Sequence, residues 1–171
     1  MKKILFAGAL TLAALQMNAE ESKVIRISTD QTDLILKVGE NGRLYQTYLG
    51  EKLLHEADVN RFSWDIHAGS DGSISQRGWE VYSGSGNEDY FEPAVAITHN
   101  DGNTSTYLYY VSSSTSPVEG GTQTTINLRD DKYPVDVTLH YVAYPKENVI
   151  KTWSEIKHQE KKPIILSTYR S

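Results

Sequence analysis

The stretch Val135–Tyr144 reads VDVTLHYVAY, and it decides the fold class. Val135, Val137, Leu139, Tyr141 and Ala143 alternate with Asp136, Thr138, His140 and Val142. Successive side chains of a β-strand point to opposite faces, so a period of two predicts a strand with one face in a core. No helical period is sustained elsewhere beyond the N-terminus, and we expect no helix longer than about two turns after residue 20.

Further strands separated by turn signals are predicted on both sides of this stretch. The turn signals include Asn41-Gly42 and Asp101-Gly102, pairs that tolerate a positive φ. Residues 50–52 are predicted to be a turn, and Ser113–Gly121, rich in Ser, Pro and Gly, is predicted to be a loop. The predicted strands are Lys23–Ile27, Leu34–Val38, Arg43–Leu49, Phe91–His99, Thr104–Ser112, Thr122–Arg129, Val149–His158 and one that begins at Ile164. Many strands at near-regular spacing predict an all-β, antiparallel β-sandwich.

Residues 55–90 break this regularity. They are rich in Asp, Ser, Gly and Asn, with scattered aromatic residues, and only Trp79–Tyr82 resembles a short strand. A long irregular segment in a compact domain is uncommon and is often functional. The alternative is a surface loop that packs on its own aromatic side chains.

The N-terminus has the pattern of an export signal. Two lysines are followed by the uncharged stretch Ile4–Leu15, which is about as long as a signal-peptide apolar region and too short to span a bilayer. We expect cleavage after Ala19, which leaves residues 20–171 as a partial domain exported to the periplasm or the extracellular space. The chain contains no cysteine, so its core alone must hold it together.

Composition and spacing exclude several functions. The formal charge of −5 argues against nucleic acid and anionic membrane as partners. The five histidines show no metal-ligand spacing, and neither a nucleophile elbow nor a phosphate-binding glycine loop is present, so no cofactor or metal is expected. Eleven tyrosines and three tryptophans suit a sugar-binding surface, a domain interface or ordinary β-strands, and composition does not separate these three.

Several segments together resemble a known family. They keep their order and approximate spacing over residues 23–166. They are Asn41–Leu53 (NGRLYQTYLGEKL), Gly86–Ala94 (GNEDYFEPA), Asp101-Gly102 with Leu108–Ser112 (LYYVS), and Val137–Tyr141 (VTLHY) with Asn148–Ile150 and Pro163–Leu166. This combination is similar to the N-terminal domain of glycoside hydrolase family 36, the α-galactosidase family.

The resemblance implies a galactose-mutarotase-like β-supersandwich, of which this chain would be about the first half. In the family a (β/α)₈ barrel follows, with two aspartates for retaining hydrolysis of terminal α-galactosides. Those residues would lie beyond Ser171, so we expect a truncated chain that is inactive by itself. The implied partners are the catalytic barrel, α-galactoside sugars bound by the full-length enzyme, and other subunits of a homo-oligomer.

The same resemblance implies a candidate binding site. In related tetramers a sandwich loop reaches the active site of a neighbouring subunit, and the matching segment here is roughly His55–Arg77. It makes Asp58, Arg61, Trp64 and Asp89 candidate substrate-binding residues. This loop lacks the family's proline-rich run. Each residue also has a plainer interpretation: Asp58 and Arg61 as a surface ion pair, Trp64 as a core residue, and Asp89 as a turn or cap residue.

Two other functions remain as hypotheses. One is a standalone carbohydrate-binding or interaction β-sandwich without catalysis. The other is a mutarotase-like isomerase, which would need a histidine acid and a carboxylate base in one cleft. Nothing in the spacing of the histidines predicts such a pair.

Overall fold

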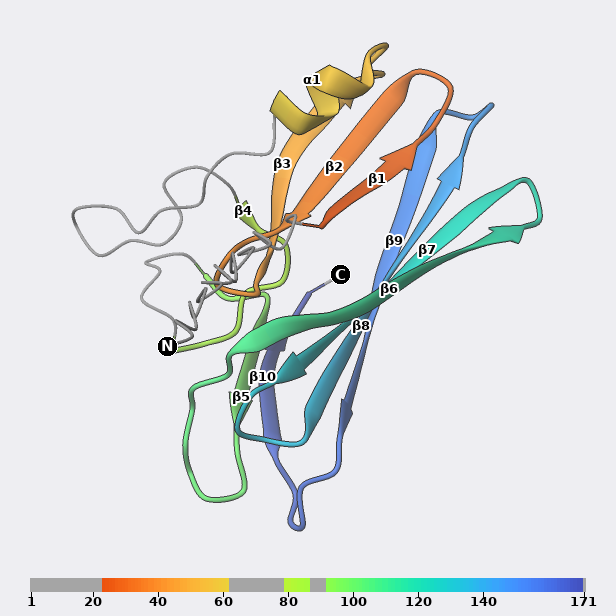
Figure 1. The fold of residues 1–171 in the computed structure, drawn as a ribbon. Helices are drawn as coiled ribbons and strands as arrows, with labels where there is room; N and C mark the ends of the chain where they lie inside the picture. Colours follow the sequence, from red (N-terminus) through yellow and green to blue (C-terminus); the bar gives the residue numbers. More distant parts are fainter. Residues whose placement is uncertain (1–22, 62–78, 87–91, 171) are drawn as a thin grey trace, which may run out of the picture.

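The computed structural model describes residues 23–61, 79–86 and 92–170, and Figure 1 shows their arrangement. This part of the chain is built from antiparallel sheets, which confirms the all-β sandwich. The predicted signal peptide, Trp64 and Asp89 lie outside the described residues. The elements are β1 (Val24–Ser28), β2 (Thr32–Val38), β3 (Leu44–Glu51), α1 (Glu56–Arg61), β4 (Trp79–Glu80), β5 (Val95–Thr98), β6 (Leu108–Val118), β7 (Gly121–Asp130), β8 (Val135–Tyr144), β9 (Val149–His158) and β10 (Ile165–Tyr169).

Three sheets form the sandwich. One has the order β1-β2-β3-β4, a second has the order β6-β7-β8-β9, and β5 pairs with β10 in a small third sheet. Figure 1 shows the two four-stranded sheets side by side at one end and the β5–β10 pair at the other. At the upper end the Thr29 hydroxyl donates a hydrogen bond to the Asn148 side-chain oxygen at 2.5 Å, so the β1–β2 turn is tied to the β8–β9 turn.

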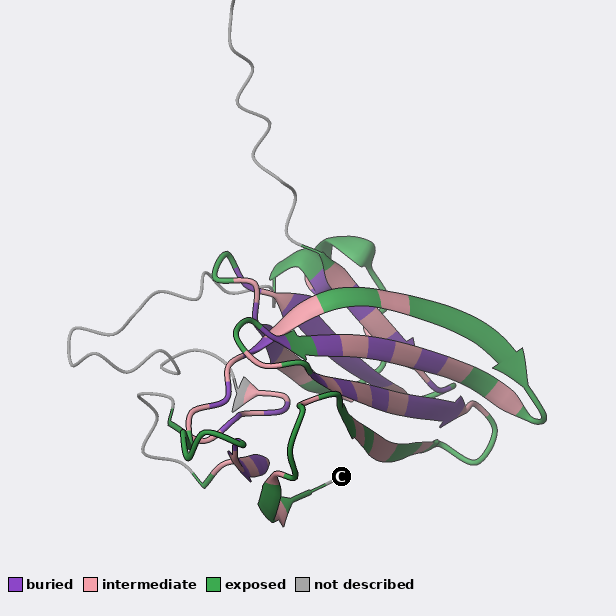
Figure 2. Cartoon of the chain, turned by 90° about the horizontal axis from the view of Figure 1, so that it is seen from below, coloured by how far each residue is buried: buried purple, intermediate pink, exposed green. Residues whose placement is uncertain are grey.

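The main core lies between these sheets. Figure 2 shows its buried residues as stripes across the strands, as expected when alternate side chains face inward. In β8 the predicted inward positions are buried, from Val135 to Ala143, and burial raises the pKa of Tyr141 to about 12. Contributors from the other sheets include Ile27, Leu36 and Ile97.

Strand β2 is buried on both faces. Leu34 and Leu36 belong to the main core, whereas Ile35 points the opposite way and is also fully buried. Tyr45 of β3 and Val59 of α1 are likewise buried outside the main core cluster. These three side chains are therefore buried outside the main core, and α1 lies beside β3 in Figure 1. The uninterrupted run of apolar residues in β2 is typical of a strand covered on both sides.

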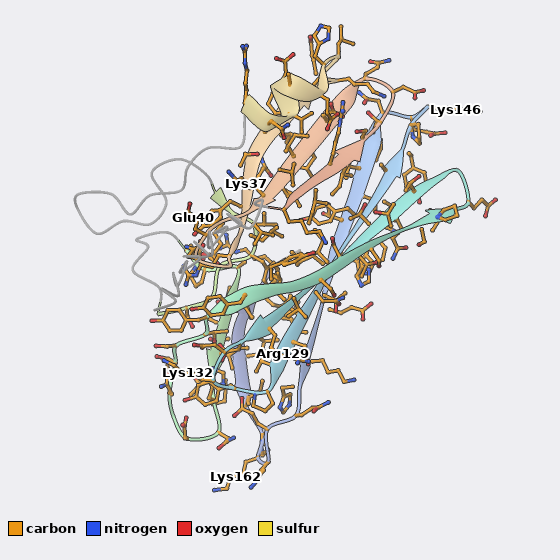
Figure 3. All side chains as sticks on the ribbon, viewed as in Figure 1. Lys37, Glu40, Arg129, Lys132, Lys146 and Lys162 are labelled. Atoms are coloured by element: carbon orange, nitrogen blue, oxygen red, sulfur yellow. The ribbon has the colours of Figure 1, made fainter. Side chains whose placement is uncertain are left out.

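Charged side chains otherwise lie mostly at the periphery. Lys146 and Lys162 project from turns at opposite ends of the sandwich, as Figure 3 shows. Lys37 of β2, in contrast, is buried. No helix in the described ranges is long and apolar enough to cross a membrane.

The predicted loop at Ser113–Gly121 is wrong. Strand β6 continues to Val118 and pairs with β7 up to Gly121, so Glu119 and Gly120 alone form the turn. Gly120 has a φ of 73°, a conformation that glycine adopts without steric cost. Residues 112–118 pair through their backbone at a sheet edge, where hydroxyl side chains can face solvent, so their weak strand propensity is overridden.

Two further boundaries differ from the prediction. Residues 50 and 51 continue β3 instead of turning. The strands predicted on either side of the Asp101-Gly102 turn do not pair with each other, because β5 pairs with β10 and β6 pairs with β7. A turn dipeptide locates a reversal of the chain, but it does not determine which strands become neighbours.

Candidate functional site

The segment that leads into α1 is held by a buried carboxylate on β2. Asp33 accepts a hydrogen bond from Arg26 Nη2 at 2.6 Å, from the Ser28 hydroxyl at 2.6 Å and from the Leu53 backbone N–H at 2.7 Å. Arg26 also donates to the Leu53 carbonyl at 2.7 Å and to Glu56, the first residue of α1, at 3.2 Å. The position of α1 is therefore fixed by the adjacent strands β1 and β2.

Arg26 and Asp33 each stabilise the charged form of the other. Burial alone would raise the pKa of Asp33, but the hydrogen bonds from Arg26, Ser28 and the Leu53 backbone outweigh it and hold the pKa below its ordinary value. The hydrogen bond to Asp33 in turn raises the pKa of Arg26. The charged pair is the stable form of this anchor.

Asp58 and Arg61 lie one turn apart on α1, a short helix within a segment for which the sequence predicts irregular structure. Arg61 Nη1 lies 4.0 Å from Asp58 Oδ1, and the two side chains are 82% and 35% exposed. This is the geometry of the surface ion pair that the sequence left open as an alternative. Both groups are also accessible to a ligand, because a guanidinium offers N–H donors and a carboxylate accepts hydroxyl protons. Trp64 and Asp89 fall outside the described ranges, so the structure brings together only two of the four candidates.

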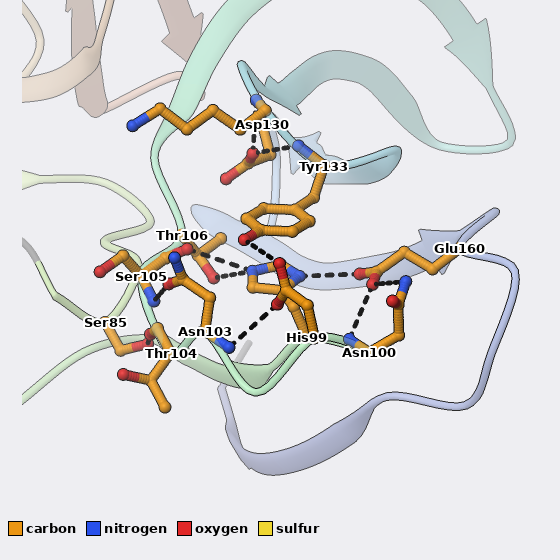
Figure 4. A network of polar contacts seen from close by, with 12 residues as sticks. Ser85, His99, Asn100, Asn103, Thr104, Ser105, Thr106, Asp130, Tyr133 and Glu160 are labelled. Atoms are coloured by element: carbon orange, nitrogen blue, oxygen red, sulfur yellow. Dashed lines mark hydrogen bonds and ion pairs between the residues drawn. The ribbon is translucent and has the colours of Figure 1, made fainter.

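Figure 4 shows a histidine–carboxylate pair that the sequence did not reveal. His99 Nδ1 lies 2.7 Å from Glu160 Oε1, and both side chains are almost completely buried. His99 Nε2 contacts the Thr106 hydroxyl at 3.2 Å, and the ring stacks on Tyr133 at 3.6 Å between centroids. The partners are 61 residues apart in the chain, so no local motif could indicate the pair.

This buried pair is a structural clasp. Glu160 also accepts a hydrogen bond from the Asn100 backbone N–H at 2.9 Å, which ties the β9–β10 turn to the end of β5. Burial alone would raise the pKa of Glu160, but its hydrogen bonds with His99 and Asn100 lower it overall. The hypothesis of a mutarotase-like isomerase requires a histidine and a carboxylate that face a cleft. His99 and Glu160 are too fully enclosed to do so.

A second histidine–carboxylate contact lies on the outer face of the β6–β9 sheet. His140 Nε2 lies 3.2 Å from Glu155 Oε1, at ion-pair distance but without hydrogen-bond geometry. The His140 ring stacks on Trp153 of the next strand, with centroids 4.6 Å apart, and Lys151 Nζ lies 5.3 Å from the centre of the Trp153 ring. A cross-strand pair of this kind stabilises the sheet.

A hollow lies between β3 and β9. It has a volume of about 350 Å³. Its lining is Thr32, Leu34, Gln46, Leu49, Tyr141, Asn148, Ile150 and Thr152. Among the residues that the structure describes, no group of three or more His, Asp or Glu side chains is placed to hold a metal ion.

Comparison with protein families assigns this fold. Residues 42–171 match the family described as "Glycosyl hydrolase family 36 N-terminal domain". The chain belongs to this family. A search of curated proteins found no match for this glycoside hydrolase family 36 chain.

Solved structures agree with the assignment at the level of the fold. The α-galactosidase of Lactobacillus brevis matches with a TM-score of 0.71 and 17% identity, over 88% of this chain and 23% of that one. Two Geobacillus stearothermophilus α-galactosidases of family 36 also match. AgaA has a TM-score of 0.72 and 20% identity over 86% of this chain and 24% of its own. AgaB has a TM-score of 0.70 and 22% identity over 88% and 23%. The chain therefore spans about a quarter of the length of these proteins.

Proposed function

We propose that this chain is the N-terminal, non-catalytic β-sandwich of a secreted α-galactosidase that hydrolyses terminal α-galactosides. The observation that carries the proposal is the family match over residues 42–171, which is to the N-terminal domain of the family. The similar α-galactosidases are about four times as long as this chain, which leaves room for a catalytic domain elsewhere in each of them.

The buried carboxylates support a non-catalytic role. Retaining hydrolysis needs two carboxyl groups about 5 Å apart across the scissile bond, each able to reach the sugar. Asp33 and Glu160 are engaged in the contacts described above, and Asp130 accepts hydrogen bonds from the backbone of Tyr107 and Tyr133. These three groups are engaged in contacts within the fold.

Two measurements test the catalytic part of this proposal. The purified 171-residue chain should show no turnover of a nitrophenyl α-galactoside, and the DNA downstream of its last codon should encode a (β/α)₈ barrel. Turnover that is abolished by substitution of an aspartate of this chain would contradict the non-catalytic role. A stop codon followed by no barrel would instead favour the standalone binding domain.

Secretion is a separate part of the proposal. The charged, then apolar, N-terminus supports it, with two lysines ahead of Ile4–Leu15. N-terminal sequencing of the protein recovered from the periplasm or the medium should begin at Glu20. Recovery of the intact N-terminus from the cytoplasm would contradict export.

We further propose that Asp58, Arg61, Trp64 and Asp89 contribute to galactoside binding, with the α1 segment reaching a neighbouring subunit's active site. The exposure of Arg61 supports this role. In the longer enzyme, Asp58→Ala or Arg61→Ala should raise KM or lower kcat without a large loss of stability. Arg129→Ala, which removes an exposed ion pair on β7, is the matched control and should leave the kinetics unchanged. Lost stability with unchanged kinetics would show that α1 has only a structural role.

A further inference from the structure

His99 has a hydrogen-bond acceptor on each side of its ring, as Figure 4 shows. Nδ1 lies 2.7 Å from Glu160 Oε1, and Nε2 lies 3.1 Å from the backbone carbonyl oxygen of Ser105. Glu160 also accepts hydrogen bonds from the backbone N–H and the side-chain amide of Asn100, at 2.9 and 2.6 Å, so its carboxylate is an acceptor in every one of these contacts. A backbone carbonyl has no proton to donate. Both contacts of the ring therefore require an N–H group on His99.

A neutral imidazole does not satisfy both contacts, because it has one N–H group and one lone pair. With the proton on Nδ1, the lone pair of Nε2 would face the Ser105 carbonyl oxygen, and two lone pairs repel each other. The Thr106 hydroxyl, 3.2 Å from Nε2, could donate to this lone pair but would leave the repulsion from Ser105 in place. With a proton on each nitrogen, both contacts become hydrogen bonds and Thr106 becomes a further acceptor.

Three carboxylates lie around the ring. Besides Glu160 of the β9–β10 turn, Asp101 of the β5–β6 turn accepts a hydrogen bond at 3.0 Å from the hydroxyl of Tyr133, whose ring stacks on His99. Asp130, at the end of β7, accepts a hydrogen bond from the Tyr133 backbone N–H at 2.7 Å. A cation that lies on an aromatic face among carboxylates is electrostatically favoured.

The lysines of the same turns have other environments. Lys132 Nζ lies 5.5 Å from the centre of the Tyr107 ring. Lys161 and Lys162, which follow Glu160 in the chain, are exposed. The positive charge that balances Glu160 is therefore supplied from within the buried contact, where the His99 side chain is 0% exposed and that of Glu160 is 1% exposed.

We propose that His99 carries a proton on both ring nitrogens in the folded chain, and that this charge makes the clasp a pH-sensitive switch. The clasp is strongest while His99 is charged and Glu160 is ionised. Loss of the second proton in alkali turns the contact of Nε2 with Ser105 into a repulsion and removes the charge from the contact with Glu160. The attachment of the β9–β10 turn to the end of β5 is then weakened.

The direction of the pH effect follows from the number of bound protons. In an unfolded chain a histidine gives up its second proton near pH 6.5. Above that pH the folded chain holds one proton more than the unfolded chain, so its stability falls as the pH rises. The contribution of His99 is fully present below about pH 6.5, whereas acid acts on Glu160. The clasp therefore has both an upper and a lower pH limit.

Nuclear magnetic resonance of the chain with ¹⁵N-labelled histidine tests the charge. At about pH 8 ordinary histidines carry a proton on one ring nitrogen only. One histidine should show protons on both nitrogens, and its signals should be missing from His99→Gln. The same difference identifies these signals in a longer protein that contains the chain. Thr106→Val should keep both protons, because the hydroxyl of Thr106 serves as an acceptor.

Thermal melts between about pH 6.5 and pH 9 test the switch. The melting temperature of the unaltered chain should fall by about 3 °C or more over this range. The fall should be clearly smaller in Glu160→Gln, which keeps an oxygen for Nδ1 but lacks the charge that holds the second proton. Glu155→Gln is the matched control, because Glu155 Oε1 lies 3.2 Å from His140 Nε2 without hydrogen-bond geometry. This control should show the full fall.

Three outcomes would overturn the proposal. They are the absence of any doubly protonated histidine at about pH 8, a doubly protonated histidine that persists in His99→Gln, and an alkaline fall that is the same in Glu160→Gln as in the unaltered chain. If His99→Gln does not fold, through-space contacts between the doubly protonated ring and the Tyr133 ring make the assignment in the unaltered chain. No galactoside enters these measurements, so the switch and the proposed function are tested independently.

Discussion

Strands β2 and β9 contain the same number of apolar residues but differ completely in burial. In β2 Leu34, Ile35 and Leu36 are consecutive, and five residues in a row are buried. In β9 the apolar residues are spread over ten positions, and none of the ten is fully buried. The difference lies in what covers each strand. Strand β2 lies between β1 and β3 and is buried on both faces, whereas β9 is an edge strand of the described sheet beside a hollow. Position in the sheet therefore determines burial more than apolar content does.

The largest effect should come from removing the buried carboxylate of β2. Asp33→Ala would remove the carboxylate that accepts hydrogen bonds from Arg26, Ser28 and the Leu53 backbone N–H, and loss of one partner of a buried charge pair costs about 3–5 kcal/mol. Urea unfolding monitored by circular dichroism would measure the loss. Ser154→Ala, at a half-buried position on β9, should cost much less; equal losses would contradict the contrast between the two strands.

Two isoleucines, one on β2 and one on β9, allow the two strands to be compared with the same substitution. Ile35→Ala on β2 should cost about 3 kcal/mol, because a fully buried side chain leaves a cavity. Ile156→Ala on β9 deletes the same atoms at a half-buried position and should cost about 1 kcal/mol. Thermal melts of both variants at one protein concentration would test the difference, which would disappear if β9 were covered in solution.

Acid should weaken the two buried anchors. The folded-state pKa values of Asp33 and Glu160 are lowered, so the stability that these carboxylates contribute is fully present above the pKa of the unfolded chain. It is lost as pH falls through the lower folded-state pKa. Melting temperature should therefore fall steeply below about pH 4, where unfolded carboxyls begin to bind protons. Asp33→Asn should flatten this part of the profile; an unchanged profile would show that other groups control it.

The smallest effect on stability is expected at α1. Arg61→Ala removes an exposed contact with Asp58 at 4.0 Å, and such surface pairs contribute about 0–1 kcal/mol. Differential scanning calorimetry of this variant against Val59→Ala, on the buried side of the same helix, would separate the two faces. A large loss for Arg61→Ala would mean that its side chain does more than form the surface pair.

The sequence predicts local features well and long-range ones poorly. The bounds of β9 and the inward positions of β8 follow from alternation and turn residues, which act over neighbouring positions. The pairing of β5 with β10 could not be predicted, because it joins segments far apart in the chain. Residues 112–118 were missed because their serines and threonines resemble a loop while their backbone pairs with β7.

The candidate site shows the same limit. The family resemblance selects the segment that contains Asp58 and Arg61, but it does not indicate that these residues form a helix turn with Val59 buried beneath them. The His99–Glu160 pair carries no local signal at all, since His99 ends a predicted strand and Glu160 lies 61 residues further along the chain. Contacts that depend on tertiary packing need the folded chain to be identified.

The clasp between His99 and Glu160 has a consequence for the order of folding. Strands β6 to β9 form a meander in which each strand pairs with the next, so each hairpin can close soon after it is synthesised. Strand β5 is made earlier, yet its partner β10 and the carboxylate of Glu160 emerge from the ribosome only after the whole meander. Closing so long a loop is entropically expensive and slow. We therefore expect β5 to pair with β10 last, after the sheet of β6 to β9 has formed.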